Sequence, residues 1–540
     1  MVHAISPAES GPRQDEHNTS VFDKLRVRRA AADRISTGIS SASDSDMFKG
    51  PSAGKPLAKD WSSHISRESQ SRPPCILKKA ATYLKTPGLI SLGGGLPSSE
   101  YFPISEMSIR VPVIPHFSEK QSLSGNPDMT QTITFGKYDA QAGLSDYDLS
   151  IALNYSQAMG SPQMMRWITE HTEIICNPPY ADWQCCPTVG STAALEQTIR
   201  MLCHRDRNDS IITEEYTFAT ALETCAPQGI KVFGAQMDEQ GLLPSSMDCI
   251  LSGWDESVRG ARKPHVLYTV PTGQNPTGAT QELQRRRDIY AVCQKHNIFI
   301  IEDEPYYFLQ MDQYINRHSL VETATSVGGF LGKLIPSFLS LDTDGRVLRM
   351  DSFSKVLVPG SRVGWVTASE QIIQRFIRHA EVANQGPSGI SQIVLWKLLD
   401  ETWGHEGYLR WLMDLRCNYT KRRNMLLAAC EDHLPQEIAS WVPPQAGMFL
   451  WIKLDHTKHP DYPRRGITEI EDELFHTAIE NGVLCASGCW FRAEPHTTPN
   501  ELFVRVTFAS ASAETMSTAI QRLSAAIRKS FRCQEADMHI

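Results

Sequence analysis

The 540-residue chain lacks the features that mark several classes of protein. Its 53 Lys and Arg against 61 Asp and Glu give a formal net charge of −8, so it has no basic excess for gripping nucleic acid. No stretch approaches the roughly 18 consecutive apolar residues of a membrane-spanning helix, and the opening MVHAISPAESGPRQDEHN has no apolar signal-peptide core. Glycine (34) and proline (32) are near average, which excludes a fibrous chain. We therefore expect a soluble cytoplasmic protein with a catalytic function.

The cysteines do not follow the spacing of a metal or redox site. There are 13, and Cys185 and Cys186 are adjacent rather than separated as in the Cys-x-x-Cys pairs of zinc and dithiol sites. We expect them to be reduced and buried, and we expect no metal. Apolar residues (41%) and charged residues (21%) occur in proportions ordinary for a protein with a sizeable core.

The pattern along the chain predicts an α/β protein. Four short apolar runs are expected to be strands of a largely parallel sheet buried on both faces, at 89–92, 265–270, 298–303 and 347–353. Helical stretches such as TAALEQTIRMLC and QELQRRRDIYAVCQKHN lie between such runs, and alternating strands and helices are typical of a sheet covered on both faces. Two later apolar runs, 447–454 and 501–508, are expected in a second, smaller α+β unit.

These expectations divide the chain into four parts. Residues 1–60 are polar and are expected to form a flexible N-terminal arm, with a short basic helix in VFDKLRVRRAAADRIS. Acidic residues interrupt this arm, which argues against a mitochondrial transit peptide. Residues 61–145 are assigned to the N-terminal part of the small domain and a substrate-side loop, 146–395 to the large domain, and 396–540 to the C-terminal small domain.

Polar residues follow the predicted strands at the points where ligands bind in α/β sheets. The turn Pro271-Thr-Gly-Gln-Asn275 follows one strand, and Asp303 ends the next in Glu-Asp-Glu-Pro-Tyr306. A third strand leads into Asp-Ser352-Phe-Ser354-Lys355, with Arg362 shortly after. Earlier, Gly190-Ser191-Thr192 opens a helix, which is a natural seat for a phosphate. Because these strand ends meet at one edge of the sheet, we expect a single site.

This set of groups is what pyridoxal phosphate requires. A lysine forms a Schiff base with the cofactor, and a carboxylate keeps the pyridine nitrogen protonated so that the ring withdraws electrons. Hydroxyls, an arginine and helix N–H groups hold the phosphate dianion.

On these residues the chain resembles fold-type I, pyridoxal-phosphate-dependent aminotransferases of class I. It is most similar to the fungal aromatic-amino-acid aminotransferases, which are related to kynurenine/2-aminoadipate aminotransferases. The resemblance runs from about Lys59 to near the C-terminus. The stretches that carry it are ISLGGGLPSSEYFP, LNYSQAMG, NPPYADWQCCPTVGSTAALE, PTGQNPTG, IIEDEPYYFLQ, LIPSFLSLDTDGRVLRMDSFSKVLVPGSRVGW and AGMFLWIKLD.

The resemblance implies a role for each matching residue. Lys355 would form the Schiff base, Asp303 would pair with the pyridinium nitrogen, and Asn275 and Tyr306 would hydrogen-bond the ring 3-oxygen. The phosphate would be held by Ser191, Thr192, Ser352, Ser354 and Arg362. Phe218 stands at the ring-stacking position, where relatives usually carry tyrosine, so the chain keeps the stacking and lacks the hydroxyl.

The remaining implied roles concern the substrate and a second subunit. Arg505, in ELFVRVTF, would bind the substrate α-carboxylate through its planar fork, and Gly94 would line the substrate side through its backbone. Tyr155 would reach the cofactor phosphate of a partner subunit, which implies a homodimer with shared active sites.

The implied activity is a ping-pong transamination from phenylalanine, tyrosine or tryptophan to a 2-oxo acid such as 2-oxoglutarate. Kynurenine and 2-aminoadipate remain possible donors. A pyridoxal-phosphate-dependent lyase or an enzyme like aminocyclopropane-carboxylate synthase could share the fold, because one fold serves several chemistries. A regulator that senses the cofactor is disfavoured, since the first 60 residues are too few and too irregular for a DNA-binding domain.

Overall fold

A computed structural model describes residues 21–35, 38–81, 83, 86, 88–90, 92–93, 95–317, 321 and 326–533. The chain divides into two units, Met1–Arg34 and Ile35–Ile540. The described part of the first unit contains helix α1 (Val21–Ala31), at the position expected for the short basic helix. The second unit contains every other element.

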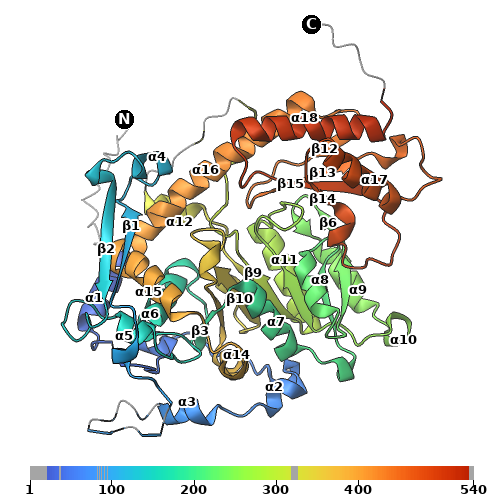
Figure 1. The fold of residues 1–540 in the computed structure, drawn as a ribbon. Coiled ribbons are helices and arrows are strands. Elements are labelled where there is room, and N and C mark those ends of the chain that lie inside the picture. Colours follow the sequence, from blue (N-terminus) through green and yellow to red (C-terminus); the bar gives the residue numbers. More distant parts are fainter. Residues whose placement is uncertain are drawn as a thin grey trace, which may run out of the picture. The chain divides into compact units, whose positions relative to one another are not determined.

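A seven-stranded sheet forms the centre of the second unit (Figure 1). Its strands, in spatial order, are β3 (Trp183–Thr188), β11 (Gly364–Ser369), β10 (Val347–Ser352), β9 (Phe299–Asp303), β8 (Val266–Thr269), β4 (Ser210–Glu214) and β5 (Lys231–Ala235). The five strands from β10 to β5 are parallel, and β11 is antiparallel to both β10 and β3. The mostly parallel sheet confirms the predicted fold class.

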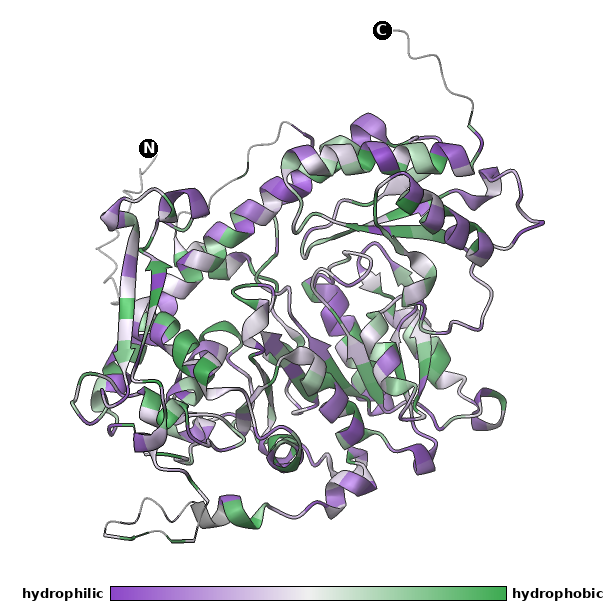
Figure 2. Cartoon of the chain, viewed as in Figure 1, coloured by the Kyte–Doolittle hydropathy of each residue, from purple (hydrophilic) through white to green (hydrophobic). Residues whose placement is uncertain are grey.

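The strands are buried because helices pack against the sheet. Every residue of β8, β9 and β10 is buried, as expected of parallel strands covered on both faces. The main helices that contact the sheet are α6 (Pro162–Ile175), α7 (Ser191–Leu202), α8 (Ala219–Cys225), α9 (Pro244–Ser252) and α14 (Glu370–Ala383), and α11 (Leu283–His296) packs against α9. Apolar residues gather on the sheet strands, whereas helices such as α18 carry both hydrophobic and hydrophilic residues along their length (Figure 2).

A smaller antiparallel sheet lies in the C-terminal part of the chain. Its strand order is β12 (Ala439–Trp441), β13 (Phe449–Leu454), β15 (Leu502–Thr507) and β14 (Ala486–Ser487). Helices α17 (Ile467–Glu480) and α18 (Ala513–Ser530) accompany it, and the 30-residue α16 (Gly404–His433) packs along α18. This arrangement places β15, which carries Arg505, opposite the strand ends of the large sheet.

Shorter elements complete the second unit. A two-stranded hairpin joins β1 (Glu106–Pro112) to β2 (Thr130–Gly136). The short helices are α2 (Arg67–Ser71), α3 (Ile76–Ala81), α4 (Glu119–Ser122), α5 (Leu149–Ala152), α10 (Glu256–Arg259), α12 (Val327–Lys333), α13 (Phe338–Leu341) and α15 (Gly389–Trp396), and the short strands are β6 (Met237–Asp238) and β7 (Gly241–Leu242). Among the helices described, none is long and apolar enough to cross a membrane.

Two sequence-based expectations need correction. Residues 38–60 are not a free arm, because Ser45 is fully buried, its N–H donates to Gln184 Oε1 (2.8 Å) and its Oγ accepts from Cys185 N (2.9 Å). Lys59 forms an ion pair with Asp344 (2.8 Å). The polar composition of this segment reflects hydrogen bonding to the large sheet and its flanking elements. The described residues of 89–92 are not in a strand, and Leu92 is 95% exposed because no sheet neighbour pairs with this run.

Candidate active site

A cavity of about 360 Å³ lies where the strands of the large sheet end and the small sheet approaches them. Its walls are formed by Ser191, Thr192, Leu195, Phe218, Val270, Asn275, Asp303, Pro305, Tyr306, Ser352, Ser354, Lys355, Pro359, Arg362, Phe449 and Arg505. The structure therefore brings together the predicted cofactor-binding and substrate-binding residues, with two exceptions. Gly94 lies outside the described residues, and Tyr155 is 56% exposed and does not line this cavity.

Asp303, the last residue of β9, is a buried carboxyl with one oxygen unsatisfied. Its Oδ2 accepts a hydrogen bond from the Tyr268 hydroxyl at 2.9 Å, whereas Oδ1 has no hydrogen-bond partner in the described part of the chain. Burial raises the pKa of Asp303 to about 7, against the lowering effect of Tyr268. A buried carboxylate that lacks a hydrogen bond at one oxygen favours a positively charged donor there, and in Asp303 that oxygen is Oδ1.

Lys355 lies in the turn after β10, where its surroundings favour the neutral, nucleophilic form of the amine. Burial lowers its pKa, and the nearby charges of Arg362 and Arg505 lower it further. The turn itself is tied to α16, because the Trp411 indole N–H donates to the Val356 carbonyl at 2.6 Å. A lysine with a lowered pKa is more often neutral, as an attacking amine must be.

The start of α7 forms a binding site suited to an anion. Gly190 precedes the helix with φ +81°, and a Cβ there would lie 2.5 Å from Nη2 of Arg362, so glycine allows the guanidinium to approach. Within the described residues, no side chain caps this helix end and Ser191 Oγ is buried without a partner. Free N–H groups, a helix dipole and an arginine together favour a phosphate.

Ser352, the last residue of β10, and Ser354, in the turn after it, complete this anion site. Ser352 Oγ donates to Ser354 Oγ at 2.8 Å and also accepts from the Ser354 backbone N–H at 3.1 Å. Arg362 donates to Ser354 Oγ at 3.4 Å and to the Pro359 carbonyl at 3.1 Å. These bonds fix the hydroxyls and the guanidinium close to the start of α7.

Arg505 reaches the cavity from β15 of the small sheet. Its Nη1 donates to Asn275 Oδ1 at 2.7 Å. The guanidinium lies over the rings of Phe449 and Phe491, at 4.4 Å and 4.6 Å from their centroids. Burial lowers its pKa. Stacked and bonded in this way, Arg505 presents a fixed cation for a planar carboxylate.

Sequence reasoning missed the groups that support these side chains. Phe449 lies in a stretch that is expected only to be a strand, Phe491 lies outside every motif described above, and Tyr268 lies in the middle of the predicted strand 265–270. An aromatic residue in a strand is usually core, so its type alone gives no signal of a site. The alternation of side chains along β8 and β9 is the signal that could have paired Tyr268 with Asp303.

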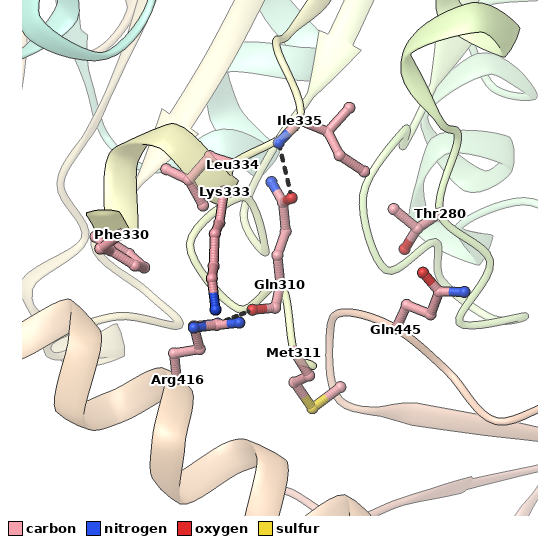
Figure 3. Close-up of a pocket in the computed structure, with 9 residues that line it drawn as sticks. All are labelled: Thr280, Gln310, Met311, Phe330, Lys333, Leu334, Ile335, Arg416 and Gln445. Carbon is pink, nitrogen blue, oxygen red and sulfur yellow. Dashed lines mark hydrogen bonds between the residues drawn. The ribbon is translucent and has the colours of Figure 1, made fainter. Parts of the chain in front are cut away.

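A second, smaller cavity of about 130 Å³ contains none of the predicted site residues (Figure 3). Gln310 lies in its middle, accepts from the Ile335 backbone N–H at 2.9 Å, and its carbonyl accepts from the Arg416 guanidinium. These bonds join the segment after α12 (Val327–Lys333), helix α16 and the segment after β9, so we interpret this cavity as structural.

The residues of the larger cavity fit pyridoxal phosphate. The unsatisfied Asp303 Oδ1 suits a ring N–H, the anion site at α7 suits a phosphate, and Lys355 supplies the amine. Phe218, which also lines the cavity, offers a ring face for stacking.

Comparisons with known proteins agree with this geometry. The family model described as "Aminotransferase class I and II" matches residues 180–523. An aromatic amino acid aminotransferase of Schizosaccharomyces pombe, C56E4.03, is 45% identical over 479 residues, covering 88% of this chain and 99% of that protein. The L-tyrosine:2-oxoglutarate aminotransferase amt1 of Serpula lacrymans is 34% identical over 461 residues, covering 82% and 85%. The crystal structure of aminotransferase Aro8 from Candida albicans has a TM-score of 0.80 and 38% identity, covering 88% and 100%.

Fold and site define a fold-type I enzyme, and the chain belongs to the class I and II aminotransferases. This family uses pyridoxal 5′-phosphate, which is therefore the cofactor of this chain. Its substrates are an amino acid and a 2-oxo acid. The predicted family, fold and cofactor are confirmed.

Proposed function

We propose that the protein is an aromatic-amino-acid transaminase that moves the amino group of phenylalanine, tyrosine or tryptophan to a 2-oxo acid such as 2-oxoglutarate. The observation that carries the proposal is the single cavity that holds Lys355, the unsatisfied Asp303 oxygen and the stacked Arg505. Two relatives named for aromatic amino acids and for tyrosine with 2-oxoglutarate support this choice of donor and acceptor.

The site residues take the following roles in the proposal. Asp303 Oδ1 accepts from the ring nitrogen of the cofactor, and Asn275 and Tyr306 bond its 3-oxygen. Phe218 stacks on the ring. The phosphate is held by Ser191, Thr192, Ser352, Ser354 and Arg362. Gly94 and Arg505 bind on the substrate side, where Arg505 donates both fork N–H groups to the α-carboxylate.

The reaction follows from these positions. When bound, pyridoxal phosphate would supply the carbon that receives the amino group and the ring that delocalises the electron pair left at the substrate α-carbon. Lys355 Nζ would accept the proton from that α-carbon. Arg505 orients the α-carbon by holding the carboxylate. In its carboxylate form, Asp303 would keep the ring nitrogen of the cofactor protonated. The same residues then handle the acceptor oxo acid in reverse, which gives ping-pong kinetics.

We further propose a homodimer in which Tyr155 reaches the cofactor phosphate of the second subunit. The region before the large sheet exposes apolar side chains that a monomer leaves in water, with Ile76 83%, Leu77 73%, Ile90 86% and Leu92 95% exposed. Tyr155 itself is exposed, and its backbone is fixed because the Ser40 hydroxyl donates to its carbonyl at 2.8 Å. Sedimentation of the loaded enzyme should give a species of twice the 60.4 kDa chain mass.

The proposed location is the cytoplasm. All 13 cysteines are free, and most are buried. Burial raises the pKa of several of these thiols, such as Cys185 to about 11. Unpaired cysteines in this number are typical of a reducing compartment. Fluorescence of the tagged full chain in cells tests the location.

A substrate panel tests the activity. The purified enzyme with L-phenylalanine and 2-oxoglutarate should yield phenylpyruvate and glutamate in equal amounts, and Lys355→Ala should yield neither. Kynurenine and L-2-aminoadipate are measured beside the aromatic donors. A higher kcat/KM for 2-aminoadipate would replace the aromatic assignment, and release of ammonia or a cyclised product instead of glutamate would favour a lyase-type enzyme.

A further inference from the structure

The buried pair of Tyr268 and Asp303 has a role beyond packing. Tyr268 lies on β8 and Asp303 at the end of the adjacent parallel strand β9, where Tyr268 pairs in register with Ile301. The Tyr268 hydroxyl donates to Asp303 Oδ2 at 2.9 Å. Tyr268 is 0% exposed and Asp303 is 5% exposed, so water contributes little to either group.

The surroundings of Asp303 make this one hydrogen bond important. Asp351 on β10 places a second negative charge near Asp303, and Tyr306, which follows β9, lies close enough to interact with Asp303 electrostatically. Glu214 on β4 adds a carboxyl near Tyr268. Asp303 forms no ion pair within the described ranges, so the Tyr268 hydroxyl is the donor that offsets burial and the charge of Asp351.

We propose that Tyr268 is a positioning residue that keeps the Asp303 carboxylate ionised and turned so that Oδ1 is left for the ring nitrogen of the cofactor. The inference rests on the proposed role of Asp303. A phenol carries a single hydrogen, so its donation to Oδ2 fixes the carboxylate plane and leaves Oδ1 unsatisfied.

The pKa values of both groups agree with this assignment. Burial and the charge of Asp303 raise the pKa of Tyr268, which therefore remains a neutral donor at any working pH. Burial and the charge of Asp351 raise the pKa of Asp303, and the hydrogen bond from Tyr268 lowers it, so that the pKa is about 7 with this bond in place. Without the bond the pKa would be higher still, so more of the acid would be protonated at neutral pH and would lose its preference for a ring N–H.

The test measures cofactor affinity rather than turnover. The full chain is dialysed free of cofactor and titrated with pyridoxal phosphate between pH 6 and pH 9, as wild type and as Tyr268→Phe. Loss of a hydrogen bond to a charged group should weaken binding about tenfold at pH 7. It should also move the acid-side fall in affinity up by about one pH unit, because a tenfold change corresponds to one unit of pKa.

Two further variants separate this role from packing. Tyr307→Phe removes another buried phenol, which donates to the Ile335 carbonyl at 3.0 Å and does not touch Asp303, so affinity and its pH profile should stay at wild-type values. In an Asp303→Asn background, Tyr268→Phe should cause no additional loss of affinity, because the carboxylate through which it acts is gone.

Three outcomes would overturn the inference. Tyr268→Phe with unchanged affinity and pH profile contradicts it, as does a loss of equal size in the Asp303→Asn background. A similar loss in Tyr307→Phe also contradicts it, since any buried hydroxyl would then do the same. If Asp303→Asn alone leaves affinity and its pH profile unchanged, the proposed role of Asp303 fails first, which distinguishes that failure from a failure of Tyr268 alone.

Discussion

Replacement of Arg505 by lysine removes a specific part of substrate recognition while it keeps the charge. Lysine offers a point charge without a planar fork, so it loses one of the two parallel hydrogen bonds to the α-carboxylate. It also loses the stacking of the guanidinium over Phe449 and Phe491, at 4.4 Å and 4.6 Å. Asn275 loses the donor at 2.7 Å that orients its amide.

The size of the effect follows from these contacts. A hydrogen bond to a charged group contributes about 1.5–3 kcal/mol net. Loss of about 2 kcal/mol of binding free energy corresponds to a fall of about 30-fold in the specificity constant kcat/KM. We therefore expect Arg505→Lys to lower kcat/KM for L-phenylalanine about 30-fold, mainly through KM, because the contact forms when substrate binds.

The assay isolates the carboxylate contact. Both amino acid and oxo acid carry an α-carboxylate, so the first half-reaction is followed alone, by the change in cofactor absorbance after L-phenylalanine is mixed with the loaded enzyme. 2-Phenylethylamine, which has the same side chain and no carboxylate, serves as the comparison substrate. Its slow reaction should be equal in wild type and Arg505→Lys.

A matched control tests whether any arginine of the small sheet region behaves alike. Arg422 on α16 donates to the Phe508 carbonyl at 2.6 Å and does not line the cavity, so Arg422→Lys should leave both half-reactions unchanged. Equal losses with phenylalanine and phenylethylamine in Arg505→Lys would refute the reasoning, because the arginine would then act on something other than the carboxylate.

Three further predictions follow from other parts of the structure. Phe491→Leu removes one stacking face of Arg505 and should raise KM for phenylalanine about fivefold in steady-state assays, consistent with a cation–π contact of about 1 kcal/mol; an unchanged KM would contradict the stacking role. Gly190→Ala places a Cβ 2.5 Å from the Arg362 guanidinium at φ +81°, so titration should show cofactor affinity at least tenfold weaker, and wild-type affinity would exclude the proposed anion site. Burial lowers the pKa of His265 from 6.5 to about 4, so between these two pH values the unfolded chain takes up a proton that the folded chain does not. The free energy of unfolding should therefore be highest above pH 6.5 and should fall by about 3 kcal/mol as the pH falls toward 4. Urea unfolding should show a shallower pH dependence in His265→Gln, and an identical slope would contradict this.

The alternation of strands and helices allowed much of the large sheet to be predicted. Strands expected at 298–303 and 347–353 are β9 and β10, and those expected at 447–454 and 501–508 are β13 and β15 within two residues at each end. Continuous apolar runs flanked by turns are informative because buried parallel strands need them on both faces. Because ligands collect at strand ends, the grouping of Lys355 with the other polar residues could also be predicted.

What the sequence could not show was which side chains support the site. Phe449 and Phe491 are ordinary aromatic residues in the sequence, and only the folding of the small sheet, in which β13 pairs with β15, places the Arg505 guanidinium over their rings. Likewise, Ser45 lies in a polar stretch that is typical of an arm, yet it is buried because its hydrogen bonds satisfy Gln184 and Cys185. Long-range pairing of polar groups leaves no local pattern.

The most direct test of the central claim is the absorbance spectrum of the purified enzyme before and after addition of L-phenylalanine, with no oxo acid present. We expect the band of the lysine-bound cofactor to be replaced by that of the amino form of the cofactor, and 2-oxoglutarate to restore the first band. Lys355→Ala should abolish the exchange. A lysine-bound band that persists with phenylalanine, tyrosine and tryptophan would contradict the proposed function while leaving the cofactor assignment in place.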